Sequence, residues 1–325
     1  MATISATSRA VGKSALRHFA SNNALVLVLY GFLTVAMIGL SIYSPTFRSP
    51  LNLWTVARQL AIPGIIGIAQ TMIILSGGID LSVASLVTFI SLICAGFMDS
   101  RAEQFAPVAA LMLVVGVAVG AFNGLVVTRG RVPPFIATLG TALLVQGAGL
   151  AYTTVPKGGI PKSMADLLYY GQLGPLPYPV ILLALVFVVM WFLLSRTAFG
   201  RNVYAVGGNA EVARRAGIPV ERTRMAVFGL GSLLVSVAAL VTTARMGIGD
   251  PLAGMGMELD SITAVVVGGT SLFGGRGSLF GTIAGVIILT LINNVMVILG
   301  VSMWYQQLIK GLVVLLVVAI YKQRA

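Results

Sequence analysis

Charged residues are scarce in this chain, and their scarcity excludes a water-soluble globular fold. Asp, Glu, Lys and Arg make up 9% of the 325 residues, while hydrophobic residues make up 58%. Soluble domains carry about 25% charged residues, because a water-facing surface has to be covered. Long apolar runs recur instead, and about 20 apolar residues in a helix cross a hydrocarbon core roughly 30 Å thick. The composition predicts an all-α, polytopic membrane protein.

Cysteine and histidine are almost missing, which removes several kinds of chemistry. The single cysteine, Cys94, lies in an apolar run, so we interpret it as a packing residue rather than a disulfide or metal ligand. The single histidine, His18, lies in a basic arm and is expected to be solvated. The "GKS" at 12–14 is not a phosphate loop, because Thr7 stands where that motif requires glycine. Metalloprotease and hydrolase motifs are also missing, so we expect no catalytic residue, metal site or cofactor in this chain.

The apolar runs predict a single helical bundle of about ten membrane segments. Nine are full spans, and the tenth (257–269) is a short segment flanked by acids, interpreted as a short or half-helix. The nine spans are 24–43, 58–76, 83–98, 107–128, 136–154, 178–195, 225–244, 279–299 and 304–321. We therefore predict an N-terminal arm (1–23) followed by one membrane domain (24–325), with both chain ends on the same side.

The net charge of +12 follows from loop bias rather than from nucleic-acid binding. Cytoplasmic loops of membrane proteins are enriched in Lys and Arg. The arm, the "RGR" at 129–131, the loop 196–224 and the C-terminal tail hold 13 of the 21 basic residues. The predicted external loops contain most of the acids: Asp99, Glu103, Asp166, Asp250 and Glu258. Both termini are therefore predicted to be cytoplasmic, with an uncleaved first helix.

Glycines follow two of the predicted helices at four-residue spacing. They are Gly116, Gly120 and Gly124 on one, and Gly277, Gly281 and Gly285 on the other. This spacing places small residues on one helix face, where backbones can approach closely. The stretches 77–93 and 274–290 both place a glycine pair before an apolar helix, which leaves open a parallel internal repeat.

Polar residues inside the spans indicate a candidate solute path. Asp80 lies between two apolar runs in "LSGGIDLSV", where an ionisable group is costly and often functional. The alternative is that Asp80 and Ser82 cap the following helix. The candidate path residues are Gln70, Asp80, Ser82, Asn123, Gln146, Asn293 and Asn294. Hydrogen bonding between helices is the alternative for each of them. Lys310 is expected to snorkel or to pair internally, and the shortage of other basic residues favours a neutral solute.

The loop 196–224 contains a segment unlike the rest of the chain, "NAEVARRAGI". Asn209 is a suitable N-cap, Glu211 lies in the first turn and Arg214 near the end, while Gly217 provides a stop. We predict a short, exposed, amphipathic helix with Gly207 and Gly208 as hinges before it. A connecting loop would not need such a helix, whereas a docking element for a cytoplasmic partner would.

Several long motifs, taken in order, resemble the permease subunits of ribose-type bacterial ABC importers. They are "SGGIDLSVASL", "GRVPPFIATLG", "GRNVYAVGGNAEVARRAGI", "ELDSITAVVVGGTSLFGGRGSLFGTIAG" and "NNVMVILGVSMWYQQLIKG". The resemblance runs from about residue 25 to the C-terminus. It implies a ten-helix permease of the bacterial inner membrane that pairs with a second copy or a homologous permease. It also implies two ATP-binding subunits, which hold ATP and Mg²⁺, and a periplasmic binding protein that delivers a sugar.

In that family, the loop matching 200–224 supplies the helix that docks on the ATPase. The candidate coupling residues here are Gly207, Gly208, Asn209, Glu211, Ala213, Arg214 and Gly217. The family pattern often reads "GIDLSVGS", and Ala84 replaces its second glycine in this chain.

Three other function classes compete with an importer subunit. An ion-coupled secondary transporter of a small polar solute needs intramembrane acids, and Asp80 is the one clear candidate. A membrane-embedded enzyme needs a catalytic cluster, and a scaffold needs no polar path. The residues favour a transport subunit over both.

Overall fold

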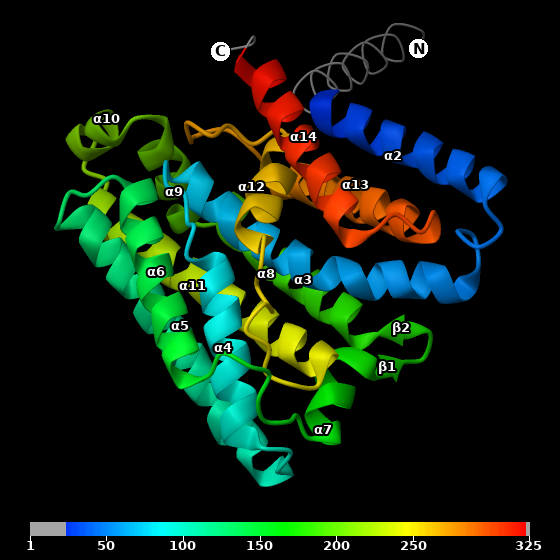
Figure 1. The fold of residues 1–325 in the computed structure, drawn as a ribbon. Helices are drawn as coiled ribbons and strands as arrows, with labels where there is room; N and C mark the ends of the chain where they lie inside the picture. The colour runs from blue at the N-terminus through cyan, green and yellow to red at the C-terminus, as the bar shows by residue number, and fades with distance from the viewer. Residues whose placement is uncertain (1–23, 323–325) are drawn as a thin grey trace, which may run out of the picture.

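The computed structural model of the chain describes residues 24–322. The predicted N-terminal arm with His18, and the last three residues, lie outside this range. The helices are α2 (Ala24–Tyr43), α3 (Pro50–Leu75), α4 (Val83–Met98), η1 (Ala102–Gln104), α5 (Phe105–Thr128), α6 (Pro134–Tyr152), α7 (Lys162–Ala165), η2 (Asp166–Tyr170), α8 (Tyr178–Arg196), α9 (Ala198–Gly208), α10 (Ala210–Arg215), α11 (Val220–Met246), α12 (Met257–Val267), α13 (Leu279–Ile298) and α14 (Met303–Lys322). Figure 1 shows their arrangement as one bundle.

Each predicted membrane segment coincides with a helix, which confirms the all-helical membrane fold. Among the described residues, seven helices are long and apolar enough to cross a membrane. Helix α4 is apolar but has only 16 residues, and α12 has 11. The number of ten membrane segments therefore stays a prediction, as does the internal repeat. A two-residue hairpin, β1 (Gln172–Leu173) with β2 (Leu176–Pro177), adds the one small sheet in this part of the chain.

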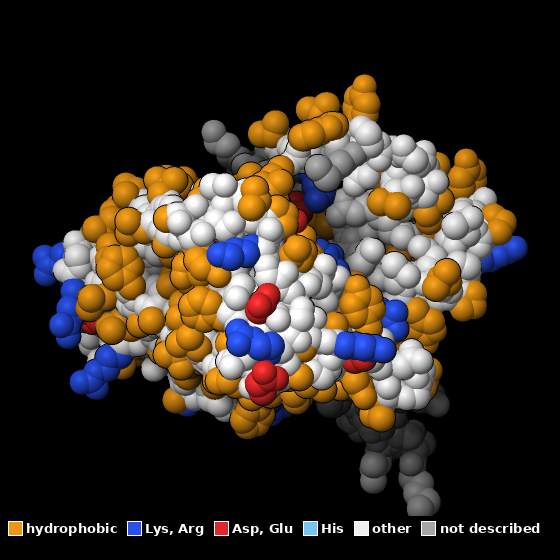
Figure 2. Space-filling view, turned by 60° about the horizontal axis from the view of Figure 1, so that its bottom comes forward, with side chains coloured by type: hydrophobic (Ala, Val, Ile, Leu, Met, Phe, Trp, Pro, Cys, Tyr) orange, Lys and Arg blue, Asp and Glu red, His pale blue; other side chains and the backbone are white. Residues whose placement is uncertain are grey.

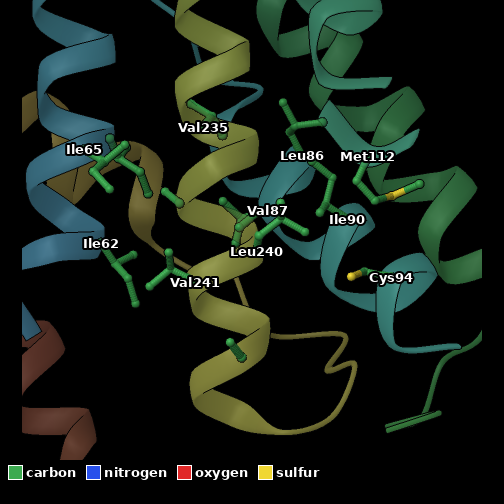
Figure 3. Packing of buried hydrophobic residues seen from close by; sticks show 14 of the residues in the cluster. Ile62, Ile65, Leu86, Val87, Ile90, Cys94, Met112, Val235, Leu240 and Val241 are labelled. Carbon is green, nitrogen blue, oxygen red and sulfur yellow. The ribbon is translucent and has the colours of Figure 1, made fainter. Parts of the chain in front are cut away.

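Helices α3 and α11 form the centre of the bundle. In the apolar window of α3, 78% of residues are buried, against 6% in α2. A helix buried on all sides belongs to a core, whereas an apolar helix with open sides suits lipid. Figure 3 shows Ile62 and Ile65 of α3 beside Val235 and Val241 of α11. Cys94 of α4 is buried in the same cluster, so its predicted packing role is confirmed.

Helix α5 packs against α11 through small residues. A Cβ atom added at Gly120 would overlap the backbone oxygen of Phe228, and one at Gly116 would overlap the side chain of Ser236. Glycine is therefore required for the two backbones to approach this closely. The same holds on α13, where Gly285 lies against the backbone of Ala264 in α12. The predicted close packing is confirmed at both stripes.

The two ends of the bundle differ in what they carry. In Figure 1 the start of α2, the end of α14 and the pair α9–α10 lie in the upper part, while α7 and the hairpin lie below. Figure 2 turns the lower end forward and shows Lys or Arg beside Asp or Glu among hydrophobic and uncharged groups. Which end faces the cytoplasm stays a prediction.

The close contact between α5 and α11 predicts that alanine substitution of Gly120 and of Gly140 will affect stability differently. Gly120→Ala should lower the stability of the purified protein by about 1–3 kcal/mol, because the added methyl overpacks the α5–α11 contact. Gly140→Ala on α6 is the matched control, since nothing lies within 4 Å of its Cβ position. The measurement is thermal unfolding in detergent. Equal midpoints for the two variants would contradict the role of Gly120.

Candidate functional site

The short helix expected in the loop is present as α10, and its caps are those predicted. The Asn209 side-chain oxygen accepts hydrogen bonds from the backbone N–H groups of Glu211 and Val212, each at 3.0 Å. At the other end, Gly217 adopts a φ of 82°, and its N–H donates to the carbonyl of Arg214. The N–H of Ile218 donates to the carbonyl of Ala213, which completes a glycine-terminated helix end.

One face of α10 is anchored and the other is charged. Ala213 is 3% exposed and packs with Val206 and Val220, which fixes α10 onto α9 and α11. On the open face, Glu211 pairs with Arg214 and Arg215, both at 3.1 Å. Exposed ion pairs contribute little to folding stability, so the buried contact of Ala213 is the main anchor of α10.

Arg214 links α10 to the start of α11. Its guanidinium donates to Glu221 at 2.6 Å, and this hydrogen bond, with the contribution of Glu211, raises the pKa of Arg214 above its usual value. Because Glu221 lies in the first turn of α11, this ion pair ties α10 to α11.

A glycine junction joins α9 to the inner end of the bundle. Gly207 lies so close to the carbonyl of Leu75 and the N–H of Gly275 that a Cβ atom would overlap both. The N–H of Gly275 donates to the Leu75 carbonyl at 3.0 Å. Gly208, by contrast, has open space around it. Gly207 is thus a contact position inside a helix, and its expected role as a hinge stays a prediction.

Three predicted path residues form one buried cluster at the start of α4. The Oδ1 atom of Asp80 accepts from the backbone N–H of Ser82 at 2.8 Å and from its hydroxyl at 2.6 Å. The Asn123 side chain donates to the Ser82 hydroxyl at 2.9 Å. All three residues are at most 1% exposed. The cluster joins α4 to α5 and supports the backbone where α4 begins.

The same cluster keeps unused hydrogen-bonding capacity. Among the described residues, neither Oδ2 of Asp80 nor Oδ1 of Asn123 has a partner. Thr138 of α6 also holds this segment, because its hydroxyl donates to the Ile79 carbonyl and accepts from the Leu81 N–H. The Asp80 carboxylate therefore supports the turn before α4. The Ser82 hydroxyl donates to that carboxylate and does not cap the helix, so the capping prediction is wrong for Ser82. Contact with a solute stays a prediction.

Among the described residues, the other four predicted path residues form no hydrogen bond to this cluster, and two of them, Asn293 and Asn294, are neighbours on α13. Asn294 of α13 exchanges side-chain hydrogen bonds with Asn52 of α3, as the interhelical alternative expected. Gln70 is fully buried, and both of its amide atoms are unpartnered among the described residues. Gln146 is exposed on α6. Asn293 lines a cavity.

That cavity, of about 210 Å³, lies between α3, α12, α13 and α14. Its polar lining is Gln59, Arg245, Asp260, Ser261, Thr263, Thr290, Asn293 and Lys310. The Lys310 ammonium donates to Oδ2 of Asp260 at 2.8 Å, so of its two expected roles the internal pairing is found. Asp260 did not stand out in the sequence. The available signal was a second acid inside "MELDSITAV", two residues after Glu258.

Comparison with known proteins agrees with this architecture. The family described as "Branched-chain amino acid transport system / permease component" matches residues 52–318. The ribose import permease protein RbsC of Bacillus subtilis is 40% identical over 297 residues, which cover 90% of this chain and 91% of that protein. The fructose import permease protein FrcC of Rhizobium meliloti is 36% identical over 318 residues, covering 94% and 87%. The D-allose permease AlsC of Escherichia coli is 34% identical over 304 residues, covering 92% and 93%. No solved structure matches the chain significantly.

These matches extend over most of the chain, and they define it as a permease component, an integral protein of the bacterial inner membrane. Within that class, the chain belongs to the family of permease subunits of ribose-type ABC importers. The resemblance inferred from the motifs is thereby confirmed.

The buried carboxylate at the start of α4 predicts a graded response to substitution. Asp80→Ala should lower the stability by about 1–3 kcal/mol, because the N–H and hydroxyl of Ser82 lose their acceptor in a buried site. Asp80→Asn keeps an acceptor oxygen and should cost less. Thermal unfolding in detergent measures both, with the exposed Asp99→Asn as control. A wild-type midpoint for Asp80→Ala would contradict the supporting role.

Proposed function

We propose that this chain is the membrane-spanning subunit of an ATP-driven importer for a sugar or a related polyhydroxylated solute. The observation that carries the proposal is the similarity to the ribose import permease over 90% of the chain. Relatives named for fructose and D-allose support a sugar without deciding which one. A periplasmic binding protein delivers the solute, and a second copy or a homologous permease completes the path.

Helix α10 is the coupling helix in this proposal. Its anchored face holds it to α9 and α11, and its charged face meets an ATP-binding subunit on the cytoplasmic side. The coupling residues are Gly207, Gly208, Asn209, Glu211, Ala213, Arg214 and Gly217. Both chain termini and α10 face the cytoplasm, and ten segments cross or enter the membrane.

The glycine junction transmits movement from α10 to the path. Because Gly207 touches the backbone of Leu75 and Gly275, α9 cannot shift without displacing the end of α3 or the segment before α13. Packed interfaces respond to small shifts by switching between discrete arrangements. Binding and hydrolysis of ATP by the partner subunits thus drive alternating access. Gln70, Asp80, Ser82, Asn123, Gln146, Asn293 and Asn294 are the proposed polar contacts along the path.

The decisive experiment reconstitutes the permease with its ATP-binding subunits and binding protein in liposomes. ATP hydrolysis is measured with the binding protein loaded from a panel of ribose, fructose and allose. One of the three sugars should stimulate hydrolysis and be taken up. Uptake that follows an ion gradient and ignores ATP would contradict the importer and support a secondary transporter.

Glu211→Ala tests the coupling helix within the same system. It removes the acid that holds Arg214 and Arg215, so the docking face loses its order. Sugar-stimulated hydrolysis should fall roughly fivefold, equivalent to about 1 kcal/mol of coupling. The matched control is Glu103→Ala on the opposite end of the bundle. Wild-type stimulation in Glu211→Ala would exclude this acid from coupling.

A further inference from the structure

The cavity between α3, α12, α13 and α14 lies at the end of the bundle away from α9 and α10. Two of its lining residues lie in the last turns of helices that end on that side: Arg245 precedes the end of α11, and Asn293 precedes the end of α13. In the proposed topology this is the outer half of the membrane. A solute released from a binding protein would enter here first.

The lining combines apolar walls with a few polar groups. Ile62, Pro63, Ile66, Val286 and Leu289 provide much of the apolar wall. Binding sites for small molecules have this composition, with polar groups that fix the orientation of the ligand. At about 210 Å³ the cavity is smaller than the roughly 300–1,000 Å³ of pockets for drug-sized ligands, so it suits a smaller solute.

The polar groups suit hydroxyl groups, which both donate and accept. The ion pair occupies Oδ2 of Asp260 and one of the three Lys310 protons, which leaves Oδ1 and two protons for a ligand. Asn293 has a buried Oδ1 atom that is unpartnered among the described residues. The Arg245 guanidinium adds further donors in a planar fork. Neighbouring hydroxyls on one small ring can meet several of these groups together.

Stability alone does not account for the ion pair. The Lys310 and Asp260 side chains are 31% and 40% exposed, so the protein does not enclose either charged group completely. Ionisable groups within membrane segments are costly and commonly mark a solute path. The pair neutralises the charges of its own two members, and Arg245 is the third charged residue of the lining.

From these observations we infer that the cavity is the outer contact site for a neutral polyhydroxylated solute, with Asp260, Lys310 and Asn293 as its hydrogen-bonding groups. The inference rests on the proposed function and adds the position of the site and the residues that recognise the solute. Asp260 and Lys310 also join α12 to α14, so solute bonding to the pair would loosen this contact as the path opens.

The test uses the complete transporter in liposomes and measures ATP-driven uptake of ribose, fructose and allose together with basal ATP hydrolysis. Asn293→Ala and Asp260→Asn should each reduce uptake of the transported sugar about tenfold, the effect of losing roughly one good hydrogen bond. Complex assembly should stay at the wild-type level. Asp99→Asn, an exposed acid outside the cavity, is the matched control. Unchanged uptake in both cavity variants would overturn the inference.

Exchanging the two charged residues of the ion pair distinguishes recognition of the solute from a purely structural contact between α12 and α14. The double variant Asp260→Lys with Lys310→Asp keeps an ion pair but inverts the donor and acceptor positions. Wild-type assembly with uptake still about tenfold low would support the site. Full uptake in the double variant would overturn it, because the pair would then be only a brace. A wild-type protein that neither couples to ATP nor takes up any of the three sugars would contradict the proposed function itself.

Discussion

In a hydrocarbon layer, each backbone N–H and C=O group has to find its partner within the protein, and this fold depends on that constraint. Helices satisfy it by themselves, but the chain also leaves helical geometry between α3 and α4 and between α12 and α13. At the first break, Asp80 and Thr138 bind the free backbone groups. At the second, the N–H of Gly275 binds the carbonyl of Leu75. The breaks persist because side chains and glycines replace the missing helical bonds.

The two breaks meet near the end of α9, so three separate parts of the chain are in contact at this end of the bundle. Gly207 can touch both breaks because it has no side chain. Helix α10 follows within two residues and is held to α9 by Ala213. The junction therefore lies between a capped helix on one side and irregular backbone on the other. Helix α3 runs from this junction to the cavity, which it lines with Gln59, Ile62 and Ile66.

The helices and the caps of α10 could be predicted from the sequence because they depend on local patterns. Long apolar runs predict helices whatever their tertiary contacts are. Asn209 and Gly217, which lie within nine residues of each other, predict the two ends of α10. The polar contacts could not be predicted in the same way. Asp260 and Lys310 are 50 positions apart, and Asn52 and Asn294 are 242 apart. Only the folded arrangement of α3, α12, α13 and α14 brings these pairs together. The sequence also does not distinguish Gly207 from Gly208. In the structure, Gly207 is enclosed by the backbone of Leu75 and Gly275, whereas nothing lies within 4 Å of the Cβ position of Gly208.

Cys94 has a practical consequence. It is the one sulfhydryl of the chain, and it lies fully enclosed among apolar side chains of α4, α5 and α11. Reagents that attack thiols need access and a thiolate, and a buried apolar position denies both. The wild-type sequence is therefore already suited to spectroscopic labelling. A cysteine introduced on the charged face of α10, or on the lipid-facing side of α2, would carry a fluorophore or spin label without prior removal of the native residue.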